Sequence, residues 1–193
     1  MRYPKKQKAE TRGRILEAAA RLFRESGYDG AGVDAIMAEA GLTAGGFYSH
    51  FRSKEALFAE AMTTALEPQH LLSGTRPNHD PLVSLIKSYL SRTHRDMTGA
   101  GCPLPAVTSD VARQGDSTRE AYERQFLKYV DEIETMLADH SGESRERALA
   151  IIAQCVGGLM LSRAVKDSKL SDQILRACRS AALEIGDVDN GTK

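Results

Sequence analysis

The stretch GLTAGGFYSHFRSKEALF, residues 41–58, carries the strongest local structural signal in the chain. Its spacing predicts a short helix over about 44–51, a break and a second helix, because Thr43 and Ser53 are residue types that favour the N-cap. Gly45 and Gly46 lie inside the first helix, although each glycine weakens a helix interior by roughly 0.5 to 1 kcal/mol relative to alanine. The pair therefore indicates a requirement other than helix stability.

The preceding residues extend this pattern to three helices. Apolar residues at helical spacing predict a helix over about 11–27 and a shorter one over about 33–40, which Gly41 ends. Two helices joined by a glycine-containing turn are typical of the helix-turn-helix, whose second helix lies in the DNA major groove. Phe47 and Phe51 would then face the core, and the glycines would permit close approach of the backbone to the duplex.

Charge is unevenly distributed along the chain, although the net charge is zero. Residues 1–14 contain six basic side chains and one acidic side chain. A basic segment suits phosphate contacts, because each neutralised phosphate releases counterions. The alternative for such a segment is a solvated terminus without a partner.

Residues of about 11–60 resemble the DNA-binding domain of the TetR family of bacterial transcriptional regulators. The family pattern ends in G-(V/L)-(S/T)-x-G-x-(L/F)-Y-x-(H/Y)-F-x-S-K-E-x-L. Residues 41–57 match it without a gap. The resemblance implies an all-α protein with a three-helix DNA-binding domain and basic arm over residues 1–55. Residues 56–193 would form a helical effector-binding and dimerisation domain.

Residue roles follow from the resemblance one position at a time. Tyr48, His50 and Lys54 match positions that usually touch phosphates. Gly46 departs from the family, in which threonine, serine or alanine is common, so DNA shape could matter more here. The family positions and the residues on the outward face of the predicted recognition helix together give the implied DNA-binding set. Its members are Thr43, Ala44, Gly45, Gly46, Tyr48, Ser49, His50 and Lys54.

The remainder of the chain also reads as helical. A loop over 72–81 ends at a capping Asp80, and helices are predicted over about 53–72, 81–97, 105–114, 117–140, 143–169 and 171–185. Aromatic and branched residues beside an irregular segment favour an apolar effector site. The residues predicted to line a pocket for a small-molecule effector are Met97, Cys102, Leu104, Phe126 and Met160.

The last two predicted helices are rich in small residues, which let helices approach closely. In the TetR family these helices usually form a four-helix bundle with a second subunit, so a homodimer is implied. The residues predicted to form its interface are Ile152, Val156, Leu159, Ile174, Cys178, Ala181 and Ile185. A dimer separates two recognition helices by roughly 34 to 36 Å, so the double-stranded DNA operator should be an inverted repeat.

The motifs that the sequence lacks favour a regulator over an enzyme. The sequence contains no HExxH, P-loop or GxSxG pattern, and the spacing of its three cysteines suits neither a disulfide framework nor a metal site. No cofactor or metal is therefore expected. No apolar run approaches the roughly 18 residues of a membrane span, and no signal-peptide core is present, so we expect a cytoplasmic protein without a membrane partner.

Two alternatives remain open beside an effector-released repressor. Cys102, in a Gly/Pro turn before a predicted helix, is either a sensor of oxidants or electrophiles or a small buried apolar residue. A helical interaction protein that never binds specific DNA is the third possibility, and binding indifferent to DNA sequence at fixed salt would favour it.

Overall fold

The computed structural model describes residues 5–66, 80–137 and 143–187. Within these residues every regular element is a helix, so the predicted all-α class is confirmed. Contacts between residues divide the chain into two compact units, residues 1–66 with 99–124 and residues 67–98 with 125–193. This division places residues after 55 with the N-terminal helices, whereas the functional boundary at residue 55 stays a prediction.

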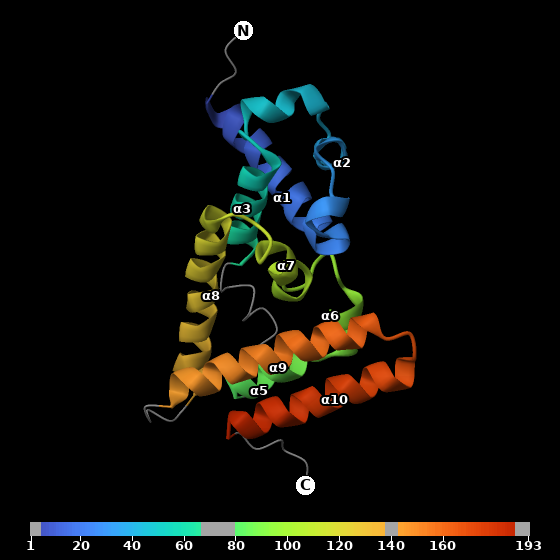
Figure 1. Ribbon diagram of the computed structural model, residues 1–193, viewed down its shortest axis with the longest axis vertical. Helices are drawn as coiled ribbons and strands as arrows, with labels where there is room; N and C mark the ends of the chain where they lie inside the picture. The colour runs from blue at the N-terminus through green and yellow to red at the C-terminus, as the bar shows by residue number, and fades with distance from the viewer. Residues whose placement is uncertain (1–4, 67–79, 138–142, 188–193) are drawn as a thin grey trace. The chain divides into compact units, whose positions relative to one another are not determined.

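The first unit is built on one long helix, α1 (Lys5–Gly30). It packs against α2 (Val33–Glu39), α3 (Lys54–Ala65) and α7 (Leu104–Val111), while the 3₁₀ helix η1 (Ala44–Ser49) packs on α2 (Figure 1). An edge-to-face pair of rings, Phe23 and Phe58, joins α1 to α3 with centroids 4.9 Å apart. The other large buried side chains of this core are Ile15, Ile36, Met37, Phe47, Leu57 and Met62.

Gly27 interrupts α1 where the sequence predicts a stop. Its φ of 71° is in the left-handed region that glycine adopts without a steric penalty. The next amide, Tyr28 N–H, donates to the buried carboxylate of Asp110 on α7 at 2.8 Å. The Tyr28 contact fixes α7 to the end of α1, and Arg113 forms a local ion pair with the same carboxylate.

The second unit contains α5 (Pro81–Tyr89), α6 (Arg92–Asp96), α9 (Ser144–Ala164) and α10 (Ser168–Ile185). In Figure 1, α9 and α10 lie side by side and run in opposite directions. The boundary between the units falls inside α8 (Asp116–Met136). Its later turns contribute Tyr129, Val130 and Ile133 to the buried residues of the second unit.

Two long helices were predicted with the wrong extent, because each ends early and a polar side chain then caps the start of a new helix. The helix predicted over 81–97 breaks at Leu90, and the Ser91 side chain then caps α6 by accepting from His94 N–H at 3.1 Å. The helix predicted over 143–169 ends at Ala164. Asp167 caps α10 by accepting from Leu170 N–H at 2.7 Å, so α10 begins three residues earlier than predicted.

Other predicted boundaries shift by smaller amounts. The first helix begins at residue 5 rather than 11, and the helix predicted over 105–114 covers 104–111. The expected caps Asp80 and Ser53 are confirmed, since each side chain accepts a backbone amide three residues later. The loop over 72–79 and the predicted helix ends at 67–72 and 138–140 lie outside the described residues.

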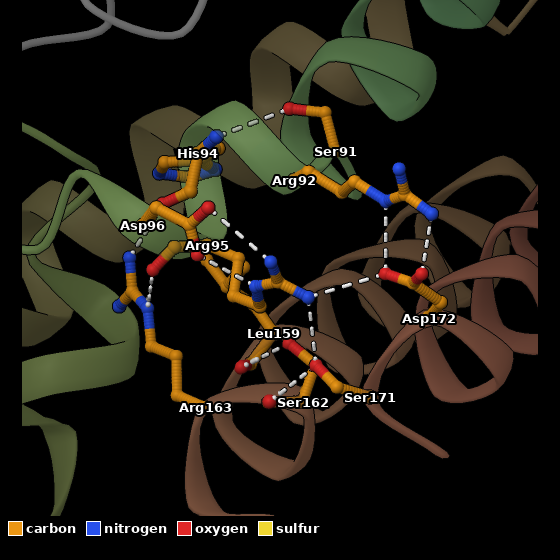
Figure 2. A network of polar contacts seen from close by, with 10 residues as sticks. All are labelled: Ser91, Arg92, His94, Arg95, Asp96, Leu159, Ser162, Arg163, Ser171 and Asp172. Carbon is orange, nitrogen blue, oxygen red and sulfur yellow. Dashed lines mark hydrogen bonds and ion pairs between the residues drawn. The ribbon is translucent and has the colours of Figure 1, made fainter. Parts of the chain in front are cut away.

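A polar network joins α6 to α9 and α10 (Figure 2). Arg95 donates to the buried Ser171 hydroxyl at 3.0 Å and to Asp172 at 3.2 Å, while Arg92 pairs with the same carboxylate. From α9, Arg163 donates to the carbonyl oxygens of Arg95 and His94. A helix of five residues is therefore held by side chains of both long helices.

One helix departs from the expected hydropathy. Among the described helices, α9 alone is long and apolar enough to cross a membrane by length and composition, with a mean hydropathy of 1.2. The expectation that no segment reaches that length is therefore corrected. The core helix of a soluble protein passes the same test, and α9 packs against α10.

Candidate nucleic-acid interface

The turn between α2 and η1 is fixed by backbone geometry and one arginine. Gly41 has a φ of 67°, and its N–H donates to Ala38 O at 2.9 Å while the Leu42 N–H donates to Met37 O at 2.8 Å. Arg14 of α1 donates to the carbonyl of Ala40. A Cβ on residue 41 would lie 2.8 Å from an Arg14 nitrogen at the end of a flexible side chain, so the positive φ is the main reason for glycine there.

The predicted recognition helix forms, but as a 3₁₀ helix rather than an α-helix. Gly46 N–H donates to Thr43 O and His50 N–H to Phe47 O, the three-residue spacing of that geometry. Two adjacent glycines explain the difference, because they lower α-helix propensity more than other residues except proline. Thr43 occupies the N-cap without a side-chain capping bond.

The inner and outer faces of η1 are those expected from the sequence. Phe47 and Phe51 are buried, with ring centroids 5.9 Å apart, and Leu42 packs beside them. Tyr48 is 76% exposed, the largest such fraction among the exposed large apolar and aromatic side chains. The other exposed residues of this face are Thr43, Ala44, Gly45 and Ser49, whereas Gly46 is half-buried.

The fold does not require the glycine pair. Neither Gly45 nor Gly46 has a positive φ. A Cβ on Gly45 would meet no atom within 4 Å, and one on Gly46 would meet Met37 at an ordinary 3.6 Å. Neither backbone conformation nor steric crowding among the described residues requires glycine at position 45, and the missing side chain leaves room for close approach of another molecule.

Replacement of Gly45 by alanine should separate folding from binding. We expect the stability of Gly45→Ala to be unchanged or raised by about 0.5 to 1 kcal/mol, because alanine has the higher helix propensity. Its affinity for specific DNA should fall about tenfold, the size of one lost base contact, because the methyl group holds the backbone away from the duplex.

The matched control is Gly13→Ala on α1, where a Cβ also meets nothing within 4 Å. Thermal unfolding and DNA titrations of both variants provide the comparison. Unchanged DNA affinity in Gly45→Ala would show that the backbone does not approach the duplex at this position.

His50 lies at the C-cap of η1 and is half-buried. Its Nδ1 is buried and has no hydrogen-bond partner within the part of the chain that the structure describes. Burial lowers the pKa of His50 below its ordinary value of 6.5, and the positive charges of Lys8 and Arg12 lower it further. The lowered pKa favours the neutral imidazole, whose predicted phosphate contact would be a hydrogen bond rather than an ion pair.

Lys54 opens α3 with its ammonium 4.5 Å from the centroid of the Tyr28 ring. Burial raises the pKa of Tyr28, and the carboxylates of Glu55 and Asp29 raise it further, so the ring stays a neutral phenol. A cation–π contact at an exposed site is worth about 0.5 to 1 kcal/mol. A phosphate could compete for the lysine, whose predicted DNA contact remains a prediction.

The basic N-terminal segment divides into free and engaged side chains. Lys6 and Lys8 are exposed on the first turns of α1. Arg12 is paired with Glu60 on α3, and Arg14 donates to Ala40, so both have partners inside the protein. These two contacts could not be predicted from the sequence, because no local pattern indicates partners 48 and 26 residues apart.

The five predicted effector residues fall in both compact units. Cys102 is half-buried and Leu104 buried in the first unit; in the second, Phe126 is half-buried and Met97 and Met160 are exposed. A groove of about 780 Å³ in the first unit is lined by Arg12 of α1, by residues 50–53 after η1, and by residues of α3 and α8 that include Thr118. None of the five predicted residues lines it, so the predicted pocket remains untested.

The predicted dimer residues lie on α9 and α10, but not all of them are accessible. Ile152 and Leu159 are buried within the protomer. The other five, Val156, Ile174, Cys178, Ala181 and Ile185, are half-buried. The exposed apolar residues of α9 are Leu149, Ala153, Met160, Leu161 and Ala164, which sequence analysis did not select for an interface.

Groups that could hold a metal are not found among the described residues, where no three histidine, cysteine or acidic side chains cluster. The cysteines Cys102, Cys155 and Cys178 form no disulfide bond in the structure. The exposed, glycine-containing face of η1, carried on a helix-turn-helix, instead defines a DNA-binding protein.

Comparisons with known proteins agree with this class. Residues 15–61 match the family model described as bacterial regulatory proteins, tetR family. The HTH-type transcriptional regulator LmrA of Bacillus subtilis (strain 168) is 27% identical over 169 residues, covering 82% of this chain and 89% of LmrA. The HTH-type transcriptional repressor DhaR of Mycobacterium sp. (strain GP1) is 26% identical over 183 residues, covering 89% of this chain and 92% of DhaR.

A solved structure gives the same result over nearly the whole fold. The crystal structure of a TetR transcriptional regulator from Chloroflexus aurantiacus J-10-FL aligns with a TM-score of 0.73 and 25% identity, covering 91% of this chain and 95% of that one. Residues 15–61 therefore belong to the TetR family of bacterial regulatory proteins, and over most of its length the chain is similar to transcriptional regulators.

Proposed function

We propose that this protein is a cytoplasmic repressor that binds an inverted-repeat operator as a homodimer and is released by a small-molecule effector. The observation that carries the DNA-binding surface is the outward face of η1, where Tyr48 is exposed and a Cβ on Gly45 would meet no atom within 4 Å. DhaR, a full-length relative, is a transcriptional repressor, which favours repression here.

Dimerisation is supported by the exposed side of α9. Leu149, Met160 and Leu161 are 42%, 39% and 58% exposed and lie on a helix otherwise packed on α10. Burial of such a strip against a second copy is favourable because it removes apolar area from water. Together with the predicted interface on α9 and α10, this strip suits a bundle of two helix pairs.

Release requires an effector that distinguishes two states of the protein. A ligand that binds the DNA-bound and free conformations equally shifts nothing, however tightly it binds. The effector site is proposed around Met97, Cys102, Leu104, Phe126 and Met160.

Fluorescence anisotropy with the DNA upstream of the protein's own gene, against shuffled DNA at physiological salt, tests the central claim. The expected result is binding at least ~10³-fold tighter to one specific sequence. If the upstream DNA is not preferred, selection from random sequences identifies the operator. Equal weak binding to every sequence selected would contradict a specific regulator.

Tyr48→Ala should weaken binding to that operator by about tenfold or more, because hydrogen bonds to charged groups contribute about 1.5 to 3 kcal/mol. The side chain is exposed, so the melting temperature should hardly change. Tyr48→Phe separates the contribution of the hydroxyl from that of the ring. If it lowers operator affinity as much as Tyr48→Ala does, the effect is due to the hydroxyl. Wild-type affinity in Tyr48→Ala would remove this residue from the interface.

A second switch through Cys102 is also proposed. The thiol is half-buried, forms no disulfide and lies within electrostatic reach of the Arg24 guanidinium, which donates to Gly99 O at 2.7 Å in the same turn. Oxidation or alkylation there would move α7, which begins two residues later. Failure of Cys102 to react with a thiol reagent in the native protein would exclude this switch.

A further inference from the structure

Three arginines of α1 hold the parts of the helix-turn-helix together. Arg14 donates to the carbonyl of Ala40 at the end of α2, and Arg21 pairs with Glu39 on the same helix. Arg12 reaches in another direction, to Glu60 on α3. Arg12 and Arg14 belong to the basic segment of residues 1–14, and Arg21 lies about two turns further along α1.

Arg12 contacts α3 and the turn that joins the recognition helix to α3. Its two terminal nitrogens donate to the two carboxylate oxygens of Glu60, the second at 2.6 Å. Its guanidinium carbon also lies 4.1 Å from the centroid of the Phe51 ring. Phe51 directly follows the C-cap of η1 and stacks on Phe47 inside it.

This geometry needs a guanidinium and not merely a positive charge. A planar fork can bind both carboxylate oxygens while its face lies on an aromatic ring, and a lysine cannot do both. The Arg12 and Glu60 side chains are 34% and 41% exposed, so the pair adds little to stability in water. Its consequence is orientation, and its charge is already neutralised by Glu60.

We propose that Arg12 is a positioning residue that sets the orientation of η1 through Phe51 and Glu60, and is not one of the basic groups that bind phosphate. The proposal rests on the DNA-binding function proposed above and extends it. A recognition helix that is mispositioned loses base contacts, whereas non-specific binding depends on phosphate charge alone. Loss of Arg12 should therefore act on specificity.

Lys8 provides a matched control, because it lies one turn before Arg12 on α1 and is exposed. Arg12→Gln and Lys8→Gln remove the same charge. We expect Arg12→Gln to lower affinity for the operator about tenfold and to leave affinity for shuffled DNA and the salt slope within error of wild type. Lys8→Gln should weaken both DNAs similarly and make the salt slope shallower by about 1.

Glu60→Gln tests the route by which Arg12 acts. If Arg12 positions η1 through Glu60, the single variants lower operator affinity by similar factors, and the double variant is no weaker than either. If Arg12 binds phosphate, Glu60→Gln should raise affinity, because it removes a competing carboxylate. The two interpretations therefore differ in the sign of the effect.

Arg12→Lys keeps the positive charge and provides a second test in case the Arg12→Gln variant does not fold. The proposal expects Arg12→Lys to retain affinity for shuffled DNA and to lose affinity for the operator; full operator affinity would overturn it. Equal losses on both DNAs for Arg12→Gln with a shallower salt slope, or no loss on either, would also overturn it. Wild-type protein without sequence preference would instead contradict the proposed function.

Discussion

Gly158→Ala is expected to destabilise the folded protein by about 1 to 3 kcal/mol, the usual range for overpacking a buried contact. A Cβ on residue 158 of α9 would lie 2.6 Å from the Cβ and 2.8 Å from the Sγ of Cys178 on α10. It would also lie 3.0 Å from a methyl carbon of Leu90. Backbone-proximal atoms cannot move aside as the end of a flexible chain can, so the two helices must separate.

Gly157→Ala is the matched control, one residue earlier in the same helix. A Cβ there meets nothing within 4 Å, so helix propensity alone predicts a gain of about 0.5 to 1 kcal/mol. Urea unfolding of both variants measures the difference, and sedimentation reports whether the added methyl at position 157 disturbs assembly. A Gly158→Ala variant as stable as wild type would show that the helices are not packed this closely.

Gly158→Ala with Cys178→Gly transfers the missing Cβ from one helix to the other. If the contact between these positions causes the loss, the double variant should be more stable than the sum of the single changes predicts. Additive losses would place the damage elsewhere, for example at Leu90.

Local rules predicted much of the N-terminal fold. Caps and stops depend on the residue itself and its near neighbours, which explains why Ser53 caps α3 and why Gly27 and Gly41 adopt positive φ values at helix ends. The burial of Phe47 and Phe51 followed from helical spacing alone. The outward positions of η1 then followed from the same periodicity.

Contacts between distant residues could not be predicted in this way. The break at Leu90 leaves a carbonyl that Arg179, 89 residues later, binds at 2.6 Å. Gly157 and Gly158 are also indistinguishable in the sequence, although only the second lies against α10. The same limit affected the interface prediction, because small and apolar residues on α9 do not reveal which side is covered within the protomer.

Arg163→Ala should destabilise the protein by about 2 to 3 kcal/mol and loosen α6 first. The guanidinium donates to Arg95 O at 3.0 Å and to His94 O at 2.8 Å, carbonyls at the end of α6 (Figure 2). Each hydrogen bond from a charged group contributes about 1.5 to 3 kcal/mol where it is shielded from water. A helix of five residues is not stable in isolation, so it depends on such contacts.

Hydrogen exchange locates the effect, and Arg176→Ala on α10 is the control because that arginine is exposed. The amides of Arg95 and Met97, which close the turns of α6 onto Ser91 and Thr93, should lose protection in Arg163→Ala. Amides of α3 should keep theirs, and Arg176→Ala should change stability by less than about 0.5 kcal/mol. Equal loss of protection in α3 and α6 would mean global unfolding, and unchanged exchange in α6 would mean that Arg95 and Asp172 hold the helix without Arg163.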